Sequence, residues 1–369
     1  MSRDRRIRRI HGADAFVRST TVALWRAPGN PLIRPEDVPA SRNDFEVIGV
    51  FNAAAARLRD EVILLLRVAE RPLNDNPALA LAPMYDPDRQ TIVTRAFAKD
   101  DTETNLSDPR LIVRAGETYL TSISHLRLAR SRDGVTFAVD DAPALSAATA
   151  YETLGIEDPR ISGIDGVYYV TYVAVSPHGV TTCLASTQDF QSLQRRGVIF
   201  PPENKDVALF AGRARDRYYA LHRPHSPLFQ RNDIWISESP DLLCWGNHRR
   251  LMGLREGLWD ETRIGAGAAP FRIDEGWLEI YHGADRNNRY CLGAVLLDGD
   301  EPWKVVARSE TPVFEPEAEY ERTGFFGNVV FTCGLLFEDE TLKIYYGAAD
   351  TTIAYAELPL ADVLATLRP

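Results

Sequence analysis

The sequence predicts an all-β protein, and more specifically a five-bladed β-propeller. The first observation is a phrase that recurs roughly every fifty residues, a period typical of propeller blades. It is a charged or glycine-containing turn followed by alternating aromatic and aliphatic residues. Its copies are RDEVILLLR (59–67), AGETYLTSIS (115–124), DGVYYVTYV (165–173), RDRYYALHR (215–223), EGWLEIYHG (275–283) and ETLKIYYG (340–347). A second phrase follows several copies, as RSRDGVTF (130–137), STQDFQSL (186–193) and SESPDLLCWG (237–246). Blades bring residues that are distant in the sequence together at a central axis.

The chain is expected to form one domain over residues 1–369, because a propeller of this length counts as one. Residues 1–45 are proline-rich and irregular, and we expect them to wrap the outside or cover one face. Residues 71–117 have a weaker period and are interpreted as an insertion in the first blade. Apolar spacing in residues 359–367 predicts a short C-terminal helix. One hairpin more than five blades need is assigned to the insertion and to a closing blade in which both ends of the chain pair.

The composition argues against several classes of function. A net charge of −10 disfavours general nucleic-acid binding, which needs a basic surface. No apolar run approaches the roughly 20 residues of a membrane span, and the basic start MSRDRRIRRIHG lacks the apolar stretch of a signal peptide. Four cysteines without metal-type spacing are expected to be buried free thiols: Cys183, Cys244, Cys291 and Cys333. We therefore expect a cytoplasmic protein without a membrane or nucleic-acid partner, and a homo-oligomer stays open.

The most specific string is GIEDPRISGIDGVYYVTYV (155–173). Pro159 lacks an N–H and should bias Asp158 towards an extended conformation, which can present a carboxylate at the start of an inner strand. A turn with a local Asp–Arg ion pair explains the motif equally well. A related DPRLIV (108–113) lowers its specificity, since Asp108 could be a structural version of the same motif.

Cationic residues recur at the ends of strands, or in loops leading to inner strands, in different repeats. They are Arg67, Lys205, His222, Arg223, Arg263 and His282. Each alone is more simply a surface ion pair, but their shared place in the repeat predicts an anion pocket. The glycines of residues 265–269 lack the context of a nucleotide-binding loop and predict close backbone approach in an inner strand. No motif for a metal or an organic cofactor is present.

The chain resembles glycoside hydrolase family 130, the mannoside phosphorylases and related mannosidases, which fold as five-bladed propellers. The resemblance runs from about residue 29 to residue 357. It rests on strings such as NPLIRPEDVP (30–39), LLLRVAE (64–70), SHLRLARSRDG (124–134), GIEDPRI (155–161), IFPPENKDVALF (199–210), ALHRP (220–224), IGAGAAP (264–270), ARSETPVFEPE (307–317) and IYYGAADT (344–351).

The resemblance implies a role for each matching residue. Asp158 would be the general acid. The phosphate-binding residues would be Arg67, Lys205, Arg223, Arg263 and His282, and the sugar-binding residues Asn52, Arg160, His222 and Asp350. Hydrolases of the family are understood to lack part of the basic set. Because this chain keeps the set, the resemblance favours an inverting β-mannoside phosphorylase that uses inorganic phosphate as co-substrate and no cofactor or metal.

Phosphorolysis with inversion fits one carboxylate and a basic cluster, since phosphate needs to be held but not activated by a base. In the family, the proton is thought to pass through the 3-hydroxyl of the mannose. A buried niche should raise the pKa of Asp158 while nearby cations should lower it, and the sequence leaves open which effect dominates. The family's usual FNPG is FNAA beside Asn52. The insertion can reshape the acceptor side, so linkage and acceptor sugar also stay open.

Two other functions remain as alternatives. An inverting β-mannosidase would need a carboxylate that activates water, for which the candidates are Glu157, Glu256 and Glu261. A non-catalytic glycan-binding propeller would need an aromatic platform, formed by Tyr151, Trp259, Tyr281 and Tyr346. Aromatic residues in propellers are more often part of the core, so this alternative ranks last.

Overall fold

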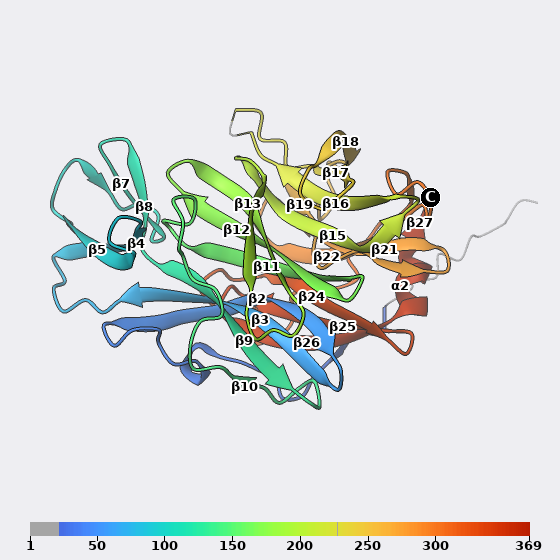
Figure 1. The fold of residues 1–369 in the computed structure, drawn as a ribbon, viewed down its shortest axis with the longest axis horizontal. Helices are drawn as coiled ribbons and strands as arrows, with labels where there is room; N and C mark the ends of the chain where they lie inside the picture. Colours follow the sequence, from blue (N-terminus) through green and yellow to red (C-terminus); the bar gives the residue numbers. More distant parts are fainter. Residues whose placement is uncertain (1–21, 227) are drawn as a thin grey trace, which may run out of the picture.

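The structure is a computed structural model that describes residues 22–226 and 228–369 (Figure 1). Almost all of its regular structure is strand. The helical elements are η1 (Pro35–Asp37), α1 (Glu319–Arg322) and α2 (Leu360–Thr366). Among the described residues, no helix is long and apolar enough to cross a membrane. The all-β prediction is therefore confirmed, and α2 confirms the predicted C-terminal helix.

Five antiparallel sheets make up the body of the protein. The first contains β2 (Phe45–Leu58), β3 (Glu61–Pro72), β9 (Ile123–Ser131) and β10 (Ala138–Val139). The second contains β11 (Ile156–Ile164), β12 (Val167–Ser176), β13 (Gly179–Thr187) and β14 (Gln194–Phe200). The third contains β15 (Asn204–Ala214), β16 (Arg217–Pro224), β17 (Ile234–Ser239) and β18 (Gly246–Met252).

The fourth and fifth sheets include strands from the end of the chain. The fourth contains β19 (Arg263–Gly265), β20 (Phe271–Ile273), β21 (Gly276–Ala284), β22 (Tyr290–Leu297), β23 (Val305–Ser309) and β27 (Leu367–Arg368). The fifth contains β24 (Val330–Glu338), β25 (Thr341–Ala348), β26 (Thr352–Pro359) and β1 (Trp25–Arg26). Since β1 pairs with β26, the first and last parts of the described chain share a sheet, as expected for the closing blade.

Apolar clusters join the five sheets in a closed cycle. Each of five clusters draws members from two neighbouring sheets, for example Leu65 and Val170, Leu184 and Leu209, Phe210 and Trp277, Leu278 and Ile344, and Tyr345 and Leu66. Strand β2 contacts both β11 and β24, and β11 contacts β15. The first strands of these sheets therefore lie side by side in the middle of the body (Figure 1).

A side lobe, residues 79–120, projects from the first sheet between β3 and β9 (Figure 1). It contains the hairpin β4 (Leu79–Asp86) and β5 (Thr91–Ala98), and the small sheet β6 (Thr104–Asn105), β7 (Leu111–Arg114) and β8 (Glu117–Leu120). The repeat at residues 115–124 begins in this lobe, whereas the other five copies cover a turn and the strand that follows it in each of the five sheets, namely β3, β12, β16, β21 and β25. The surplus repeat thus begins at the end of the predicted insertion, residues 71–117, and extends beyond it. Of the predicted N-terminal wrap, residues 1–21 lie outside the described residues.

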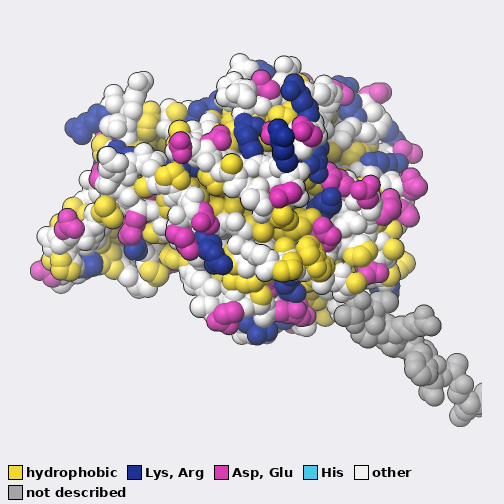
Figure 2. All heavy atoms as spheres, turned by 90° about the horizontal axis from the view of Figure 1, so that it is seen from below, with side chains coloured by type: hydrophobic (Ala, Val, Ile, Leu, Met, Phe, Trp, Pro, Cys, Tyr) yellow, Lys and Arg dark blue, Asp and Glu magenta, His cyan; other side chains and the backbone are white. Residues whose placement is uncertain are grey.

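Charged side chains of both signs lie on the surface of the protein. Figure 2 shows a face on which acidic, basic and apolar side chains are interspersed.

Three cysteines are buried and free, as predicted: Cys183, Cys291 and Cys333. The prediction is wrong for Cys244, which is exposed. It lies in the turn between β17 and β18, where its backbone N–H donates to Asp241 Oδ1 at 2.8 Å.

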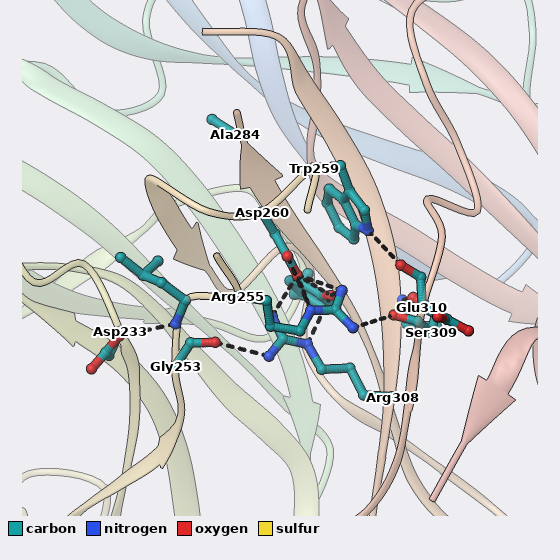
Figure 3. Close-up of polar contacts among 12 residues, drawn as sticks. Asp233, Gly253, Arg255, Trp259, Asp260, Ala284, Arg308, Ser309 and Glu310 are labelled. Atoms are coloured by element: carbon teal, nitrogen blue, oxygen red, sulfur yellow. Dashed lines mark hydrogen bonds and ion pairs between the residues drawn. The ribbon is translucent and has the colours of Figure 1, made fainter. Parts of the chain in front are cut away.

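A buried ionic cluster fixes the loop that leads into β19 (Figure 3). The Asp260 carboxylate is fully buried and accepts from Arg255 Nη2 at 2.6 Å, Arg308 Nη2 at 2.6 Å and the Tyr281 hydroxyl at 2.9 Å. Arg308 belongs to β23 and Tyr281 to β21. The cluster therefore ties the loop to two strands of the fourth sheet, just before Arg263.

Candidate active site

A polar cavity of about 350 Å³ opens where inner strands of the five sheets meet the side lobe. Its polar lining is Asn52, Arg67, Arg110, Ser122, Glu157, Asp158, Lys205, Asp206, Arg223, Arg263, His282, Tyr290 and Asp350. Its apolar lining includes Phe51, Leu111, Leu120, Phe325, Phe326, Val329 and Phe331. Eight of the ten predicted site residues meet here, although they come from all five sheets or the turns between their strands.

The same backbone device presents three of these side chains. Asn52, Asp158 and Asp206 have φ values of 51°, 46° and 54°, and each lies at a register shift in the first strand of its sheet. Such a bulge turns one side chain away from the regular alternation. Asparagine and aspartate tolerate the left-handed region better than most residues. The prediction that Pro159 holds Asp158 extended is therefore wrong, because the bulge places Asp158 in that region.

Asp158 lies on one side of the cavity, the acid side, with Asn52, Arg67, Glu157 and Asp350. Its Oδ1 accepts from Asn52 Nδ2 and from Arg67 Nη1, both at 2.9 Å. Arg67 also donates to Glu157 Oε1 at 2.7 Å. Arg67, predicted to bind phosphate, thus has both of its terminal nitrogens engaged by carboxylates.

The two aspartates of the acid side differ in proton affinity. Burial raises the pKa of Asp158, but the charge of Arg67 and the hydrogen bond from Asn52 outweigh it and hold the pKa below its ordinary value. Burial raises the pKa of Asp350 to about 6, a shift that Arg67 opposes and the charge of Asp158 reinforces. At neutral pH Asp158 is therefore ionised, and the carboxyl group of Asp350 binds a proton more tightly than that of Asp158 does.

Lys205, Arg223, Arg263 and His282 form a second group in the lining, the cation side. Lys205 and Arg223 are cross-strand partners on β15 and β16. Burial and the charge of Arg223 lower the pKa of Lys205. Within the described residues neither Lys205 nor Arg263 forms an ion pair, although Arg263 Nη1 donates to the Tyr290 hydroxyl at 2.8 Å. Their charges therefore remain available to an anion.

Asp206 organises this side and was not predicted. Its buried carboxylate pairs with Arg223 Nε at 2.6 Å and with Arg160 Nη2 at 3.3 Å, and His282 Nε2 lies 3.5 Å away. Burial lowers the pKa of His282, so its ring is neutral, and neither ring nitrogen has a hydrogen-bond partner among the described residues. His282 therefore offers a neutral ring nitrogen rather than the predicted charge.

The glycine-rich segment leaves room for this arrangement. A Cβ atom on Gly265 would lie 2.3 Å from Asp206 Oδ2 and 2.5 Å from His282 Cε1. On Gly267 it would lie 2.1 Å from the Ile280 carbonyl oxygen. The predicted close backbone approach is confirmed at both positions.

Two predicted sugar-binding residues lie outside the cavity lining. Arg160 is fully buried and donates to the carbonyl oxygens of Gly267 at 2.6 Å and Ala266 at 2.8 Å, so it supports the glycine-rich segment from behind. His222 is buried against Phe200, with ring centroids 4.8 Å apart, and its Nδ1 lies 3.1 Å from Asn204 Nδ2. Because neighbouring side chains on a strand point to opposite faces, Arg223 faces the cavity and His222 does not.

The residues named for the alternative functions are mostly elsewhere. Glu157 lines the cavity but is paired with Arg67, while Glu256 and Glu261 are not part of the lining. Trp259, Tyr281 and Tyr346 are buried in the core, and Tyr151 is exposed away from the cavity. Among residues 22–226 and 228–369, no group of three or more His, Cys, Asp or Glu side chains could hold a metal ion.

Other lining residues also escaped prediction. Arg110 comes from the side lobe, Tyr290 from the start of β22, and Phe325 and Phe326 from the segment before β24. The second DPR motif was the one signal for Arg110. No signal in the strand pattern marks the two phenylalanines, because they lie between repeats.

Comparisons with known proteins show the family of the chain. The model of glycoside hydrolase family 130, described as beta-1,4-mannooligosaccharide phosphorylase, matches residues 109–368. The beta-1,2-mannobiose phosphorylase of Listeria innocua serovar 6a is 46% identical over 345 residues, which cover 92% of this chain and 97% of that protein. The 1,2-beta-oligomannan phosphorylase of Thermoanaerobacter sp. (strain X514) is 37% identical over 294 residues, covering 79% of this chain and 97% of that protein.

A solved structure extends the likeness to the fold. The beta-1,2-mannobiose phosphorylase from Listeria innocua, in complex with beta-1,2-mannobiose, superposes with a TM-score of 0.90 at 45% sequence identity. The match covers 93% of this chain and 99% of that chain.

Proposed function

The chain belongs to glycoside hydrolase family 130, and from that premise we propose that it is an inverting phosphorylase of β-1,2-linked mannosides. Inorganic phosphate and a β-mannosyl oligosaccharide give α-mannose 1-phosphate and the shortened acceptor. The mannoside phosphorylase activity follows from relatives at up to 46% identity. The linkage, the roles of individual residues and the use of phosphate without any other cofactor are the proposed part.

One observation carries the proposal. A single cavity is lined by Asp158 and by Lys205 and Arg263, and neither cation forms an ion pair with a carboxylate among the described residues. An inverting hydrolase needs a second carboxylate to activate water. Of the other carboxylates in the lining, Glu157 is paired with Arg67 at 2.7 Å and Asp206 with Arg223 at 2.6 Å, while Asp350 is assigned below to the mannosyl unit. Two cations without carboxylate partners in the described part of the cavity suit phosphate better than water.

The proposed reaction assigns each side a step. Phosphate binds on the cation side, and one of its oxygens forms a bond to C1 of the mannosyl unit from the α face. The bond from C1 to the acceptor oxygen breaks, and that oxygen receives the proton of Asp158. Attack and departure on opposite faces invert the configuration. Arg67 is assigned to positioning Asp158 and Glu157, while Asn52 and Asp350 are assigned to the mannosyl unit.

The protonation of Asp158 is coupled to phosphate in this proposal. The Asp158 carboxylate is ionised at neutral pH because Arg67 and Asn52 hold its pKa below the ordinary value. A phosphate dianion nearby adds negative charge, which favours the protonated form of a neighbouring carboxyl group. Bound phosphate would thus raise the pKa of Asp158 and favour its protonated form.

The fold proposed for this activity is a five-bladed propeller. The five sheets, their closed cycle of apolar clusters and the contacts among β24, β2, β11 and β15 support it. In that arrangement the first strand of each sheet faces the axis. Bulges at Asn52, Asp158 and Asp206 would then present side chains to one axial site.

The test is a product assay with purified protein. With β-1,2-mannobiose and phosphate we expect equimolar mannose 1-phosphate and mannose, and no turnover in phosphate-free buffer. Two mannoses per disaccharide at the same rate without phosphate would establish a hydrolase instead. β-1,4-mannobiose serves as the linkage control, and a preference for it over the β-1,2 isomer would overturn the proposed linkage.

A further inference from the structure

The second DPR motif reaches the candidate active site from outside the five sheets. Arg110 lines the polar cavity, although it belongs to the side lobe inserted between β3 and β9. Leu111 and Leu120 of the same lobe line the cavity beside it. The lobe is therefore a wall of the site and not a remote appendage.

The turn that carries Arg110 is held by local hydrogen bonds. The Asp108 carboxylate accepts from the Arg110 backbone N–H at 2.9 Å, and its carbonyl accepts from the Leu111 N–H at 3.1 Å. Thr121, just after β8, donates its backbone N–H to the Arg110 carbonyl at 2.9 Å and its hydroxyl to the Pro109 carbonyl at 2.9 Å. The turn thus has a fixed position relative to β8.

An ion pair with a carboxylate distinguishes Arg110 from Lys205 and Arg263. Its Nε and Nη2 donate to the two oxygens of Asp108 at 3.0 and 2.7 Å, a bidentate pair. The Arg110 side chain holds the pKa of Asp108 at about 2, so the carboxylate stays ionised and neutralises the guanidinium. The remaining guanidinium N–H groups have no partner among the described residues. A neutralised pair with free donors suits sugar hydroxyls, whereas the unpaired Lys205 suits phosphate.

Two aromatic rings face the lobe across the mouth of the cavity. The Arg110 guanidinium carbon lies 5.6 Å from the centre of the Phe326 ring. The Phe325 side chain lines the cavity and is 51% exposed. The backbone N–H groups of Phe325 and Phe326 donate to Thr351 Oγ1 at 2.8 Å and to the Ala349 carbonyl at 3.0 Å. The backbone of both phenylalanines is thereby fixed to the turn that carries Asp350.

We propose that Arg110, held by Asp108 and lying over the Phe326 ring, is a specificity-determining residue that binds the acceptor sugar. An exposed apolar ring beside oriented polar donors is what a sugar needs, with C–H groups on one side and hydroxyls on the other. This inference rests on the proposed phosphorylase function. In this arrangement the side lobe binds the acceptor sugar, which is the leaving group in phosphorolysis, and the five sheets bind the mannosyl unit and phosphate.

The test compares both directions of the reaction in Arg110→Ala and in Arg114→Ala. Arg114 is the matched control, since it lies on the same lobe in an ion pair with Asp101 and outside the cavity lining. In the synthetic direction, with α-mannose 1-phosphate as donor, Arg110→Ala should raise the KM for the mannose acceptor about ten-fold or more, as expected for lost charged hydrogen bonds. In phosphorolysis its KM for phosphate should stay within about two-fold, because distant contacts act independently.

A third variant tests the role of Asp108. Asp108→Asn keeps the size of the side chain but loses the bidentate ion pair, so it should raise the acceptor KM in the same direction and by less. A raised phosphate KM in Arg110→Ala with an unchanged acceptor KM would instead place Arg110 in the phosphate site. Unchanged values for both would reduce the lobe to a structural role. Either result would leave phosphate-dependent turnover of the unaltered protein intact, so the failure of this inference is distinguishable from failure of the proposed function.

Discussion

Asp158 has a backbone with positive φ, and its hydrogen-bond partners lower the pKa of its side chain. The bulge in β11 turns its side chain into the cavity, where Arg67 and Asn52 fix one carboxylate oxygen at 2.9 Å each. The same contacts that aim the group also lower its pKa. The geometry therefore supplies orientation, and protonation must come from the bound substrates.

Replacing Asp158 by asparagine should abolish most of the activity without unfolding the protein. The amide keeps the size of the side chain and an oxygen acceptor for Arg67, but it has no transferable proton. We expect the rate to fall by roughly 10²–10⁴-fold, the range of general acid catalysis. The measurement is kcat at saturating phosphate, with circular dichroism as the check on folding. Asp108→Asn is the comparison variant, and if it were the inactive one, the acid would be in the other DPR motif.

Asp350 offers a test through stability rather than rate. Its pKa is about 6 in the folded protein against an ordinary value of 3.8. Between these two pH values the folded protein binds the proton more tightly than the unfolded chain, so Asp350 makes the protein progressively less stable as pH rises. Above pH 6 the ionised Asp350 lowers the free energy of unfolding by a constant amount. This amount is at most about 3 kcal/mol, and solvent in the cavity reduces it. Asp350→Asn removes it.

The free energy of unfolding of Asp350→Asn should therefore exceed that of the unaltered protein at pH 8. The advantage should shrink as pH falls from 6 towards 4. Urea unfolding at several pH values measures both quantities. An advantage of equal size at pH 4 and pH 8 would mean that titration of Asp350 does not cause it.

Individual elements owe their position to buried polar contacts as well as to apolar packing. The loop before β19 is an example, because Asp260 holds it against β21 and β23 through Arg255, Arg308 and Tyr281 (Figure 3). Removing one partner of a buried ionic group leaves the others uncompensated. β19 carries Arg263 and Gly265, so the cluster also supports the cation side of the cavity.

Asp260→Ala should lower the free energy of unfolding by about 3–5 kcal/mol. The matched control is Asp44→Ala, which breaks the exposed pair with Arg42 and should cost no more than about 1 kcal/mol. Urea midpoints at constant slope give both values. Similar small losses in the two variants would show that the Asp260 cluster is not a stabilising anchor.

At the scale of the whole molecule, the sequence predicts which strands exist better than which side chains meet. The turn-and-strand period identified a turn and the strand that follows it in each of the five sheets, and the EDPR string identified Asp158. Asp206 escaped because its importance depends on Arg160, Arg223 and His282, which belong to three strands distant in sequence. Adjacent His222 and Arg223 show another limit: strand alternation dictates that only one faces the cavity, but not which one.

The shared bulge is a signal that a comparison of repeats could have found. Asn52, Asp158 and Asp206 each follow a polar or aromatic residue near the start or middle of an inner strand, and each adopts positive φ. The acceptor side had no comparable signal. It is built from the side lobe and the segment of Phe325 and Phe326, whose positions depend on tertiary packing and not on the strand period.

Phosphate should stabilise the whole molecule, because its proposed ligands come from two neighbouring sheets. Lys205 and Arg223 belong to the third sheet, and Arg263 and His282 to the fourth. A ligand that binds only the folded state adds about 2.7 kcal/mol at a concentration 100 times its Kd. Phosphate should therefore raise the Tm in a concentration-dependent way, and chloride at equal ionic strength should not.

Arg223→Ala should need about ten- to a hundred-fold more phosphate for the same rise in Tm, since a charged hydrogen bond is worth about 1.5–3 kcal/mol. Arg217→Ala is the matched control, because Arg217 begins the same strand and is exposed outside the cavity lining.

The loss in Arg223→Ala should appear in the KM for phosphate much more than in the KM for the mannoside, since the two bind on opposite sides of the reacting carbon. If phosphate raised the Tm of Arg223→Ala and of the unaltered protein at the same concentrations, phosphate would have to bind elsewhere, and the division of the cavity into an acid side and a cation side would lose its meaning for catalysis.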